Sequence, residues 1–160
     1  MSAFDLIKAD PLIATNFFLE IDGAVITNVT SVDGLTLEIE KADVLQRQTD
    51  GAFVQHTTMS KNKFTGELTI KRLAPLDATS DELWKWFMAI RTSGMSVAAR
   101  AGERKSGSVV IYDTTMTEIS RWNFTEAWPS KIASDSVDVS KNEPISETIT
   151  LQYETLIRKK

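Results

Sequence analysis

The chain has 160 residues, no cysteine, a single histidine and a formal net charge of −4. A chain of this length buries roughly 70% of its unfolded surface on folding, so its core needs neither a metal nor a disulfide. The lack of cysteine excludes thiol catalysis and cysteine-ligated zinc, and the modest acidity argues against holding a nucleic-acid backbone over a large surface. We expect one domain, residues 1–160.

The first fifteen residues, MSAFDLIKADPLIAT, do not resemble a signal peptide, because Asp5, Lys8 and Asp10 interrupt the apolar run. No stretch approaches the ~20 apolar residues of a membrane-spanning helix. We therefore expect a protein that is made and assembled in the cytoplasm and does not insert stably into a membrane.

Alternation of apolar and polar residues dominates the chain and predicts β-strands. The first strand ends at Asp22-Gly23, a dipeptide typical of tight hairpin turns, and Gly66 marks a point of close approach or a bulge in a later strand. About seven or eight strands are expected, in a mainly β, antiparallel barrel-like or sandwich-like domain. The strand-forming stretches cover residues 17–22, 24–29, 35–40, 64–71, 109–112 and 148–154.

One flanking amphipathic helix is predicted at about residues 80–92. Thr79 and Glu82 have the spacing of a capping box, and Gly94 suits the C-terminal end. The segment RWNFTEAWPSK supplies aromatic side chains to cover the helix face, Trp128 among them if the strand runs regularly that far. The predicted helix–sheet core comprises Leu83, Trp86, Phe87, Ile90, Trp122 and Phe124.

A polar segment at about residues 41–62, with Asp50-Gly51 in its middle, predicts an extended hairpin arm. The segment has too few apolar residues to bury a face alone, and an isolated two-stranded ribbon is marginal in water. Either the arm is mobile in the monomer or a partner orders it.

No catalytic set emerges from the sequence. His56, the only histidine, lies in the predicted arm, and one histidine cannot build a two-His or three-His metal site. Glu38, Glu40 and Glu67 are the candidate carboxylates, but strand alternation explains each of them as a solvated side chain. ERKSGS lacks the glycines of a phosphate-binding loop. We expect no enzyme, no catalytic residue, no cofactor and no metal.

Two classes of function remain. Unpaired polar strand edges and an unpartnered arm favour a structural protein that assembles, because exposed edges are usually blunted, closed or paired with another chain. The alternative is a small β-barrel that acts as a monomer and binds an apolar ligand in its mouth. A hydrolase is a third hypothesis, and it lacks a general base.

Four stretches, in order, resemble the tail-tube protein family of contractile phages and contractile injection systems, which is related to the hemolysin-coregulated protein of type VI secretion. They span roughly residues 16 to 156, and RWNFTEAWPSK is the most specific. The chain departs from the family where Leu73-Ala74-Pro75 follows Arg72, since members often carry glycine there. The matching stretches are NFFLEIDGAVITNVTSVDGLTLEIE, KFTGELTIKR with DELWKWF, GSVVIYD with RWNFTEAWPSK, and NEPISETITLQYETL.

The resemblance implies a structural inner-tube subunit of a contractile tail or injection system. Hexameric rings would join their sheets around a channel and stack into a tube, which a contracting sheath pushes through a target envelope. The implied partners are further copies of the chain, sheath protein, baseplate or tube-initiator proteins, and cargo or DNA in the channel. After cytoplasmic assembly the protein would be part of a virion, or of an extracellular or cell-associated injection particle.

The resemblance also implies roles for particular residues. The arm would be the ring-stacking element, with Leu45, Arg47 and Phe53 in contact with the next ring. Polar strand positions would line the channel, although an outer solvated face is the alternative for the same residues. The expected channel-lining residues are Thr36, Glu38, Glu67, Thr69 and Lys71.

Overall fold

The computed structural model of the chain describes residues 16–93 and 102–160. Strands predominate, and one 12-residue helix interrupts them between β6 and β7. In chain order the elements are β1 (Phe17–Ile21), β2 (Ala24–Ile26), β3 (Val29–Asp33), β4 (Glu38–Arg47), β5 (Phe53–Lys63), β6 (Gly66–Leu73), α1 (Glu82–Ser93), β7 (Lys105–Tyr112), β8 (Glu118–Ser134), β9 (Ser146–Tyr153) and β10 (Thr155–Arg158).

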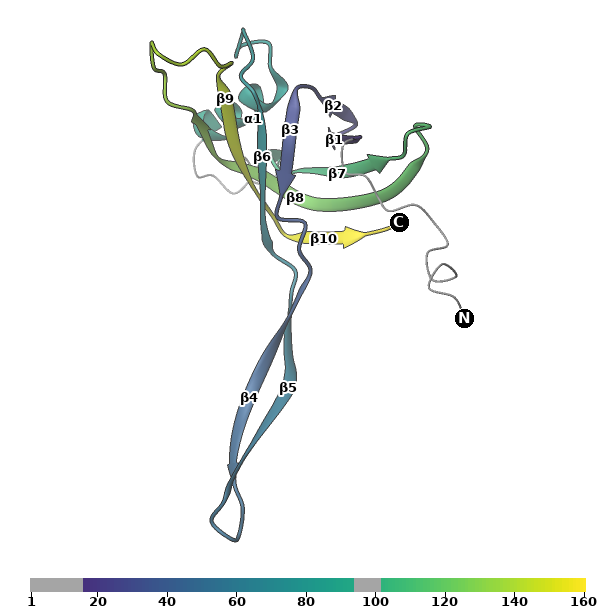
Figure 1. Ribbon diagram of the computed structural model, residues 1–160, viewed down its shortest axis with the longest axis vertical. Coiled ribbons are helices and arrows are strands. Elements are labelled where there is room, and N and C mark those ends of the chain that lie inside the picture. Colours follow the sequence, from purple (N-terminus) through teal and green to yellow (C-terminus); the bar gives the residue numbers. More distant parts are fainter. Residues whose placement is uncertain (1–15, 94–101) are drawn as a thin grey trace.

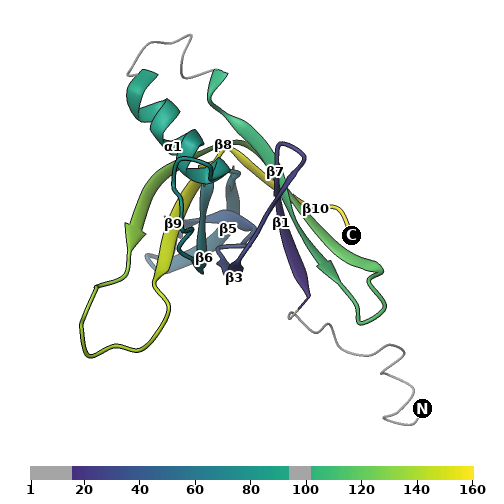
Figure 2. The same ribbon diagram turned by 90° about the horizontal axis from the view of Figure 1, so that it is seen from above.

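The strands of the body form one strongly curved antiparallel sheet in the order β2-β1-β7-β8-β9-β6-β3, with β10 beside β8. Only residues 27–28 separate β2 from β3, so the two ends of the sheet come back toward each other (Figure 2). The described strands do not close into a barrel, because β2 and β3 are not paired. The predicted mainly β, sandwich-like fold is confirmed, with α1 as the one helix whose span lies within the described residues.

The long strand β8 belongs to both layers of the sandwich. Its first half pairs with β7 and β10, and its second half pairs with β9. We call β1, β2, β7, β10 and residues 118–125 sheet A, and β3, β6, β9 and residues 128–134 sheet B. The two layers are therefore continuous through one bent strand.

A bulge divides β8. Glu126 has a positive φ of 52°, and the pairing with β7 shifts at this point. Phe124 is buried before the bulge and Ala127 is buried after it, so the inward-facing positions change from even to odd numbers. Trp128 therefore does not continue the Phe124 face, as a regular strand would require. It is half-buried, with the Arg104 guanidinium 5.1 Å from its ring centroid.

The core fills the space between the two sheets and extends to α1 at the end of the body away from the arm. Side chains that alternate toward this space are fully buried, as the period-two pattern predicts. They include Leu19, Val109 and Phe124 from sheet A, and Leu68, Ile70, Ile149 and Leu151 from sheet B.

The cap of α1 differs from the prediction. The Asp81 carboxylate accepts a hydrogen bond from the Trp84 backbone N–H at 3.0 Å, which makes Asp81 the N-cap. Thr79 instead donates its hydroxyl to Asp77 at 2.6 Å, in a turn that precedes the helix. The predicted capping box of Thr79 and Glu82 is wrong, and the predicted stop at Gly94 lies outside the described residues.

The stretch 35–40, predicted as one strand, is divided. β3 ends at Asp33, and β4 begins only at Glu38. Gly34 has a φ of +96°, and a Cβ at this position would collide with the Glu67 carbonyl oxygen. Only glycine fits this turn, which redirects the chain from sheet B into the arm.

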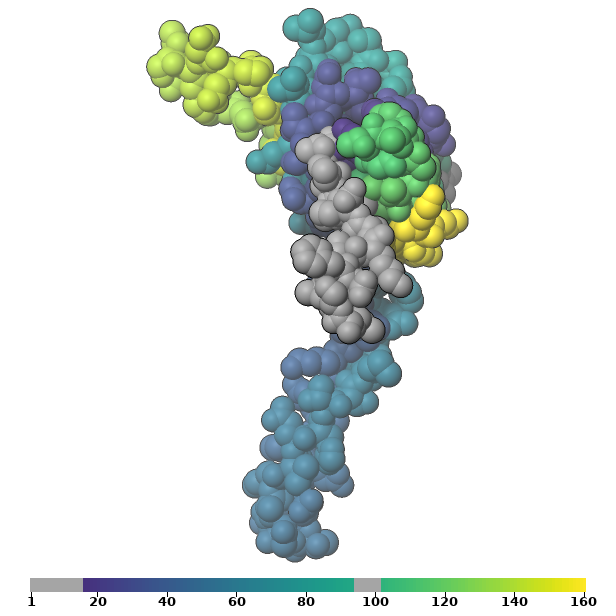
Figure 3. Space-filling model, turned by 45° about the vertical axis from the view of Figure 1, so that its right-hand side comes forward, coloured from purple at the N-terminus to yellow at the C-terminus, as the bar shows by residue number. Residues whose placement is uncertain are grey.

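The arm, defined as β4, β5 and the turn at residues 48–52, is a separate two-stranded ribbon (Figure 1). It projects away from the body, and the space-filling view shows the part toward its tip clear of the body surface (Figure 3). Gly51, with a φ of +88°, lies at the tip, where the Gln48 N–H donates to the Ala52 carbonyl at 2.8 Å. The hairpin predicted at about residues 41–62 is thus present, with its turn at Asp50-Gly51.

Candidate assembly interfaces

Sheet B has an open edge at each end. β3 pairs with β6 on one side, and no other strand of the described residues pairs with its second side. At the opposite end, residues 131–134 of β8 pair with β9 alone among the described strands. Unpaired N–H and C=O groups at such edges are templates for another strand. Two open edges on one sheet allow a second copy to add at each end.

The outer face of sheet B is polar. Glu67, Thr69 and Lys71 alternate along β6 with side chains that are buried in the core. Thr69 lies between Asp33 and Thr150 of the neighbouring strands. Three of the residues expected to line a channel thus share one face.

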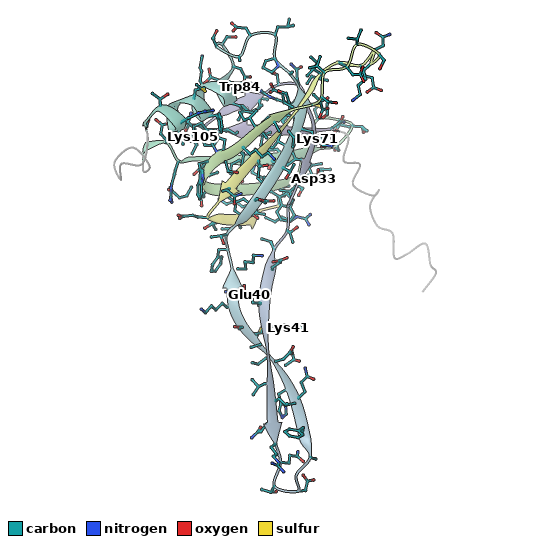
Figure 4. The ribbon with its side chains drawn as sticks, turned by 90° about the vertical axis from the view of Figure 1, so that its left-hand side faces the viewer. Asp33, Glu40, Lys41, Lys71, Trp84 and Lys105 are labelled. Atoms are coloured by element: carbon teal, nitrogen blue, oxygen red, sulfur yellow. The ribbon has the colours of Figure 1, made fainter. Side chains whose placement is uncertain are left out.

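Neighbouring strands extend this face with residues that the sequence interpretation did not assign. Lys71 lies beside Ser31 and Thr148, and Gln152 donates to the Glu67 carboxylate at 3.0 Å. Figure 4 shows Asp33 and Lys71 on adjacent strands above the root of the arm. The alternation of residues 148–152 is the signal that identifies the β9 members. The unassigned residues are Ser31, Asp33, Lys131, Thr148, Thr150 and Gln152.

Thr36 and Glu38, the other two expected channel residues, lie off sheet B at the root of the arm. They line a hollow together with Glu67 and Tyr153. Glu38 accepts a hydrogen bond from Lys63 at 2.9 Å, and this bond raises the pKa of the Lys63 ammonium. The structure therefore brings Thr36 and Glu38 next to the polar face but not into its strands.

The three predicted stacking residues lie together near the tip of the arm. Arg47 is paired with Phe53 across the ribbon, and Leu45 precedes Arg47 by two positions, so all three side chains share one face. The Arg47 guanidinium lies 5.8 Å from the Phe53 ring centroid. Leu45 is 66% exposed, Phe53 64% and Met59 80%. These large apolar side chains are therefore left mostly uncovered by the described residues of a single copy.

The opposite face of the arm has a different chemistry. Val44 is paired with His56, and Gln46 with Val54, so this face carries no carboxylate, lysine or arginine between residues 42 and 58. Val44 is exposed as well. Both faces of the ribbon therefore present apolar surface to solvent, and backbone pairing with a few exposed side-chain contacts, such as the hydrogen bond from Thr57 to Asp43 at 2.7 Å, holds it together.

The residues expected in the helix–sheet core occupy different depths. Leu83, Trp86 and Phe124 are buried, whereas Ile90 and Trp122 are partly buried against the core. Phe87 is half-buried and meets the Trp84 ring edge to face at 6.3 Å between centroids. This depth follows from the position of α1 at one end of the sandwich, where only one side of the helix meets both sheets.

A buried ionic cluster fixes the start of α1 to sheet B. Arg72 of β6 donates two hydrogen bonds of 2.7 Å to Asp81 and one of 3.2 Å to Glu147 of β9. The Trp84 indole N–H also donates to Glu147 at 3.2 Å. Burial opposes ionisation of Asp81, but the hydrogen bonds from Arg72 and from the Trp84 backbone outweigh it and lower the pKa of the carboxyl. Every carboxylate in the cluster is matched by donors, which is the arrangement of a structural support.

The described residues contain no group of three or more histidine, aspartate or glutamate side chains arranged to hold a metal ion. Among the same residues, no helix has the length and apolar character needed to cross a bilayer.

Sequence comparison decides the family. The model of the family described as T4-like virus tail tube protein gp19 matches residues 13–157, nearly the whole chain. The chain belongs to this tail tube protein family. The resemblance predicted from four ordered stretches is confirmed, and the role that goes with the family is that of a structural tube subunit. A comparison with curated protein sequences gave no significant match.

Solved structures share the fold. The anti-feeding prophage cap, described as a tube terminating cap, is 18% identical, with a TM-score of 0.75 over 94% of this chain and 92% of that one. A chain of the PVC sheath-tube complex, from an extracellular contractile injection system in its extended state, is also 18% identical, with a TM-score of 0.70 over 99% and 98%. Hcp1 from Flavobacterium johnsoniae is 19% identical, with a TM-score of 0.50 over 90% and 94%.

Proposed function

We propose that the protein builds the inner tube of a contractile tail or injection system by forming hexameric rings that stack around a channel. The observation that carries this proposal is sheet B, which has open edges at both ends and a polar outer face in a member of the tail tube family. A rotation that joins one edge to the other closes a ring.

Within a ring, β3 of one copy pairs with residues 131–134 of β8 in the next copy. Both segments lack a second strand partner among the described residues, and backbone hydrogen bonding between them satisfies the open groups of each edge. Repeated around the ring, the four-strand sheets merge into one large barrel. Sheet A then forms the outer layer.

The outer face of sheet B lines the channel in this arrangement. Each copy contributes two carboxylates, Asp33 and Glu67, and two lysines, Lys71 and Lys131, so the charges on this face balance. Between them lie Thr69, Thr148 and Thr150. A wall rich in hydroxyl groups and without a net field lets cargo pass without strong adsorption.

The arm stacks one ring on the next. Its strands contribute no fully buried side chain to their own body, and Leu45, Arg47 and Phe53 together form an exposed face near the tip. No part of the body that the structure describes covers this face, and another copy can bury it. Since the arm projects from one end only, the contact runs head to tail, and a head-to-tail contact that does not close produces a filament.

The further partners follow from the same assignment. The solved relatives include a tube in complex with its sheath, a tube-terminating cap and a component of a baseplate. We extend these partners to the chain: sheath protein around the tube, baseplate or initiator proteins at its end, and cargo or DNA inside. The particle is assembled in the cytoplasm and acts as part of a virion or of an extracellular or cell-associated injection system.

The proposed role is mechanical rather than enzymatic. The alternative of a ligand-binding monomeric barrel needs an open interior, but the middle of the space between the sheets is filled by fully buried side chains such as Leu68, Ile70 and Phe124. No specific observation favours that alternative.

Replacement of residues 43–58 by an Asn-Gly turn tests the proposal. The body should keep its β-sheet circular dichroism signal and its melting temperature, because among the described strands those of the arm pair only with each other. Electron microscopy should show rings without tubes. Tubes as long as those of the unmodified chain would remove the arm from the stacking interface.

A further inference from the structure

The end of the body opposite the arm carries exposed apolar side chains on two neighbouring loops, residues 74–81 and 135–145. These loops lie at the top of Figure 1, whereas the arm extends from the bottom. Leu76 of the first loop is fully exposed (109%), and in the second loop Val137 is 83% exposed and Val139 is 105% exposed. Exposed apolar side chains scattered singly are ordinary, but several on neighbouring loops at one end of the molecule point to an interaction site.

The two loops have a defined shape. The Ala74 N–H donates to the Ile145 carbonyl at 2.9 Å, which joins the first loop to the second. Asp77 accepts hydrogen bonds from the backbone and hydroxyl of Thr79, and Asp138 does the same for Ser140. The exposed aliphatic side chains thus stand on preorganised turns, which reduces the entropy lost when a partner binds.

The loops are acidic, and the arm offers cations. Both Asx-type turns hold their carboxylates ionised: the Thr79 hydroxyl lowers the pKa of Asp77, and the Ser140 backbone lowers the pKa of Asp138. Asp135 and Glu143 add two carboxylates, and Lys141 is the one cation of the two loops. The arm carries four carboxylates and four cations, and of the cations Arg47 and Lys61 take part in no ion pair with the described residues.

We propose that these two loops are the docking surface for the arm of a second copy in the adjacent ring, with Leu76, Val137 and Val139 covered by apolar side chains of the arm. This inference rests on the proposed tube function and adds its receiving surface. The two surfaces lie at opposite ends of the molecule, so one contact repeats along the tube axis without closing. In this arrangement the free cations Arg47 and Lys61 of the arm can pair with the loop carboxylates, which favours this direction of stacking.

Cross-linking of single-cysteine variants tests the contact, because the chain has no cysteine of its own. Val139→Cys protein is mixed in turn with Leu45→Cys, Phe53→Cys and Met59→Cys protein, assembled, and treated with a short flexible bismaleimide. At least one mixture should give a product of two chains that neither variant gives alone. In the matched control, Thr114→Cys in the exposed β7–β8 turn replaces Val139→Cys, and this mixture should give no two-chain product.

Tubes that yield no more product than the control in all three mixtures overturn the docking surface and leave the tube function standing. Failure of the unmodified chain to form rings or tubes overturns both. If the cysteine variants do not enter tubes, the double variant Val137→Ser, Val139→Ser decides. Rings with tubes shortened or lost support the docking surface, and tubes of ordinary length overturn it.

Discussion

Arg72 and Asp81 form a bidentate ion pair in which both guanidinium hydrogen bonds measure 2.7 Å. The Arg72 side chain is 3% exposed and the Asp81 side chain 18% exposed, so the pair is largely removed from water. Asp81 is also the N-cap of α1, and Glu147 of β9 supplies a second carboxylate to the same guanidinium. One cluster therefore fixes the helix, β6 and β9 to each other.

Arg72→Ala should destabilise the fold by about 3–5 kcal/mol, since removal of one partner leaves buried carboxylates without their cation. Urea unfolding monitored by tryptophan fluorescence measures this change. The matched control is Lys85→Ala, which removes an exposed pair with Glu82 and should cost less than about 1 kcal/mol. Equal costs for the two variants would mean that the Arg72 cluster is not a structural support.

Acid should weaken the fold through Asp81. Its folded-state pKa lies below the ordinary value of 3.8, so its stabilising contribution is present above that value and is lost as the pH falls through the folded pKa. Asp81→Asn retains a good N-cap but cannot ionise. The difference in unfolding free energy between the unmodified chain and Asp81→Asn should therefore shrink below about pH 4. A difference that stays constant with pH would contradict this assignment.

The two aromatics of β8 should differ in their contribution to stability. Phe124 is fully buried between the sheets, and Phe124→Ala should cost about 3–5 kcal/mol. Trp122 is only partly buried and lies under the Arg158 guanidinium, 5.7 Å from the ring centroid, so Trp122→Ala should cost on the order of 2 kcal/mol. Thermal unfolding of both variants compares the two stability costs. A larger loss of stability for Trp122→Ala than for Phe124→Ala would contradict this prediction.

The accessibility of a thiol on the outer face of sheet B should show whether this face lines the channel. In tubes of Thr150→Cys protein, a small maleimide should label the single cysteine, whereas a maleimide on a long polymer should reach only the tube ends. Dispersed subunits should react with both reagents. Equal labelling of intact tubes by the two reagents would place this face outside.

Much of the fold follows from local sequence rules. Period-two alternation predicts the strands that build both layers, and Asp22-Gly23 and Asp50-Gly51 each mark a tight hairpin turn that is present in the structure. The projecting hairpin arm is also predictable, because a segment with so few apolar residues cannot form a buried core of its own. The polar face of sheet B follows from the same alternation once the strands are aligned.

Other features depend on tertiary contacts that no local pattern encodes. The bulge at Glu126 places a non-glycine residue at positive φ, and only the change of layer along β8 explains it. Arg72 occupies an inward-facing strand position that alternation assigns to an apolar residue, and it is stable there because Asp81 and Glu147 meet it. Asp81, rather than Thr79, caps the helix because its carboxylate is held in place by Arg72.

Negative-stain electron microscopy of the purified, unmodified chain tests the central claim most directly. We predict hollow rings and tubes with an axial channel, because among the described residues sheet B has two open edges and the arm packs against no part of the body. Particles no larger than a monomer, at concentrations where tail tube subunits assemble, would contradict the claim.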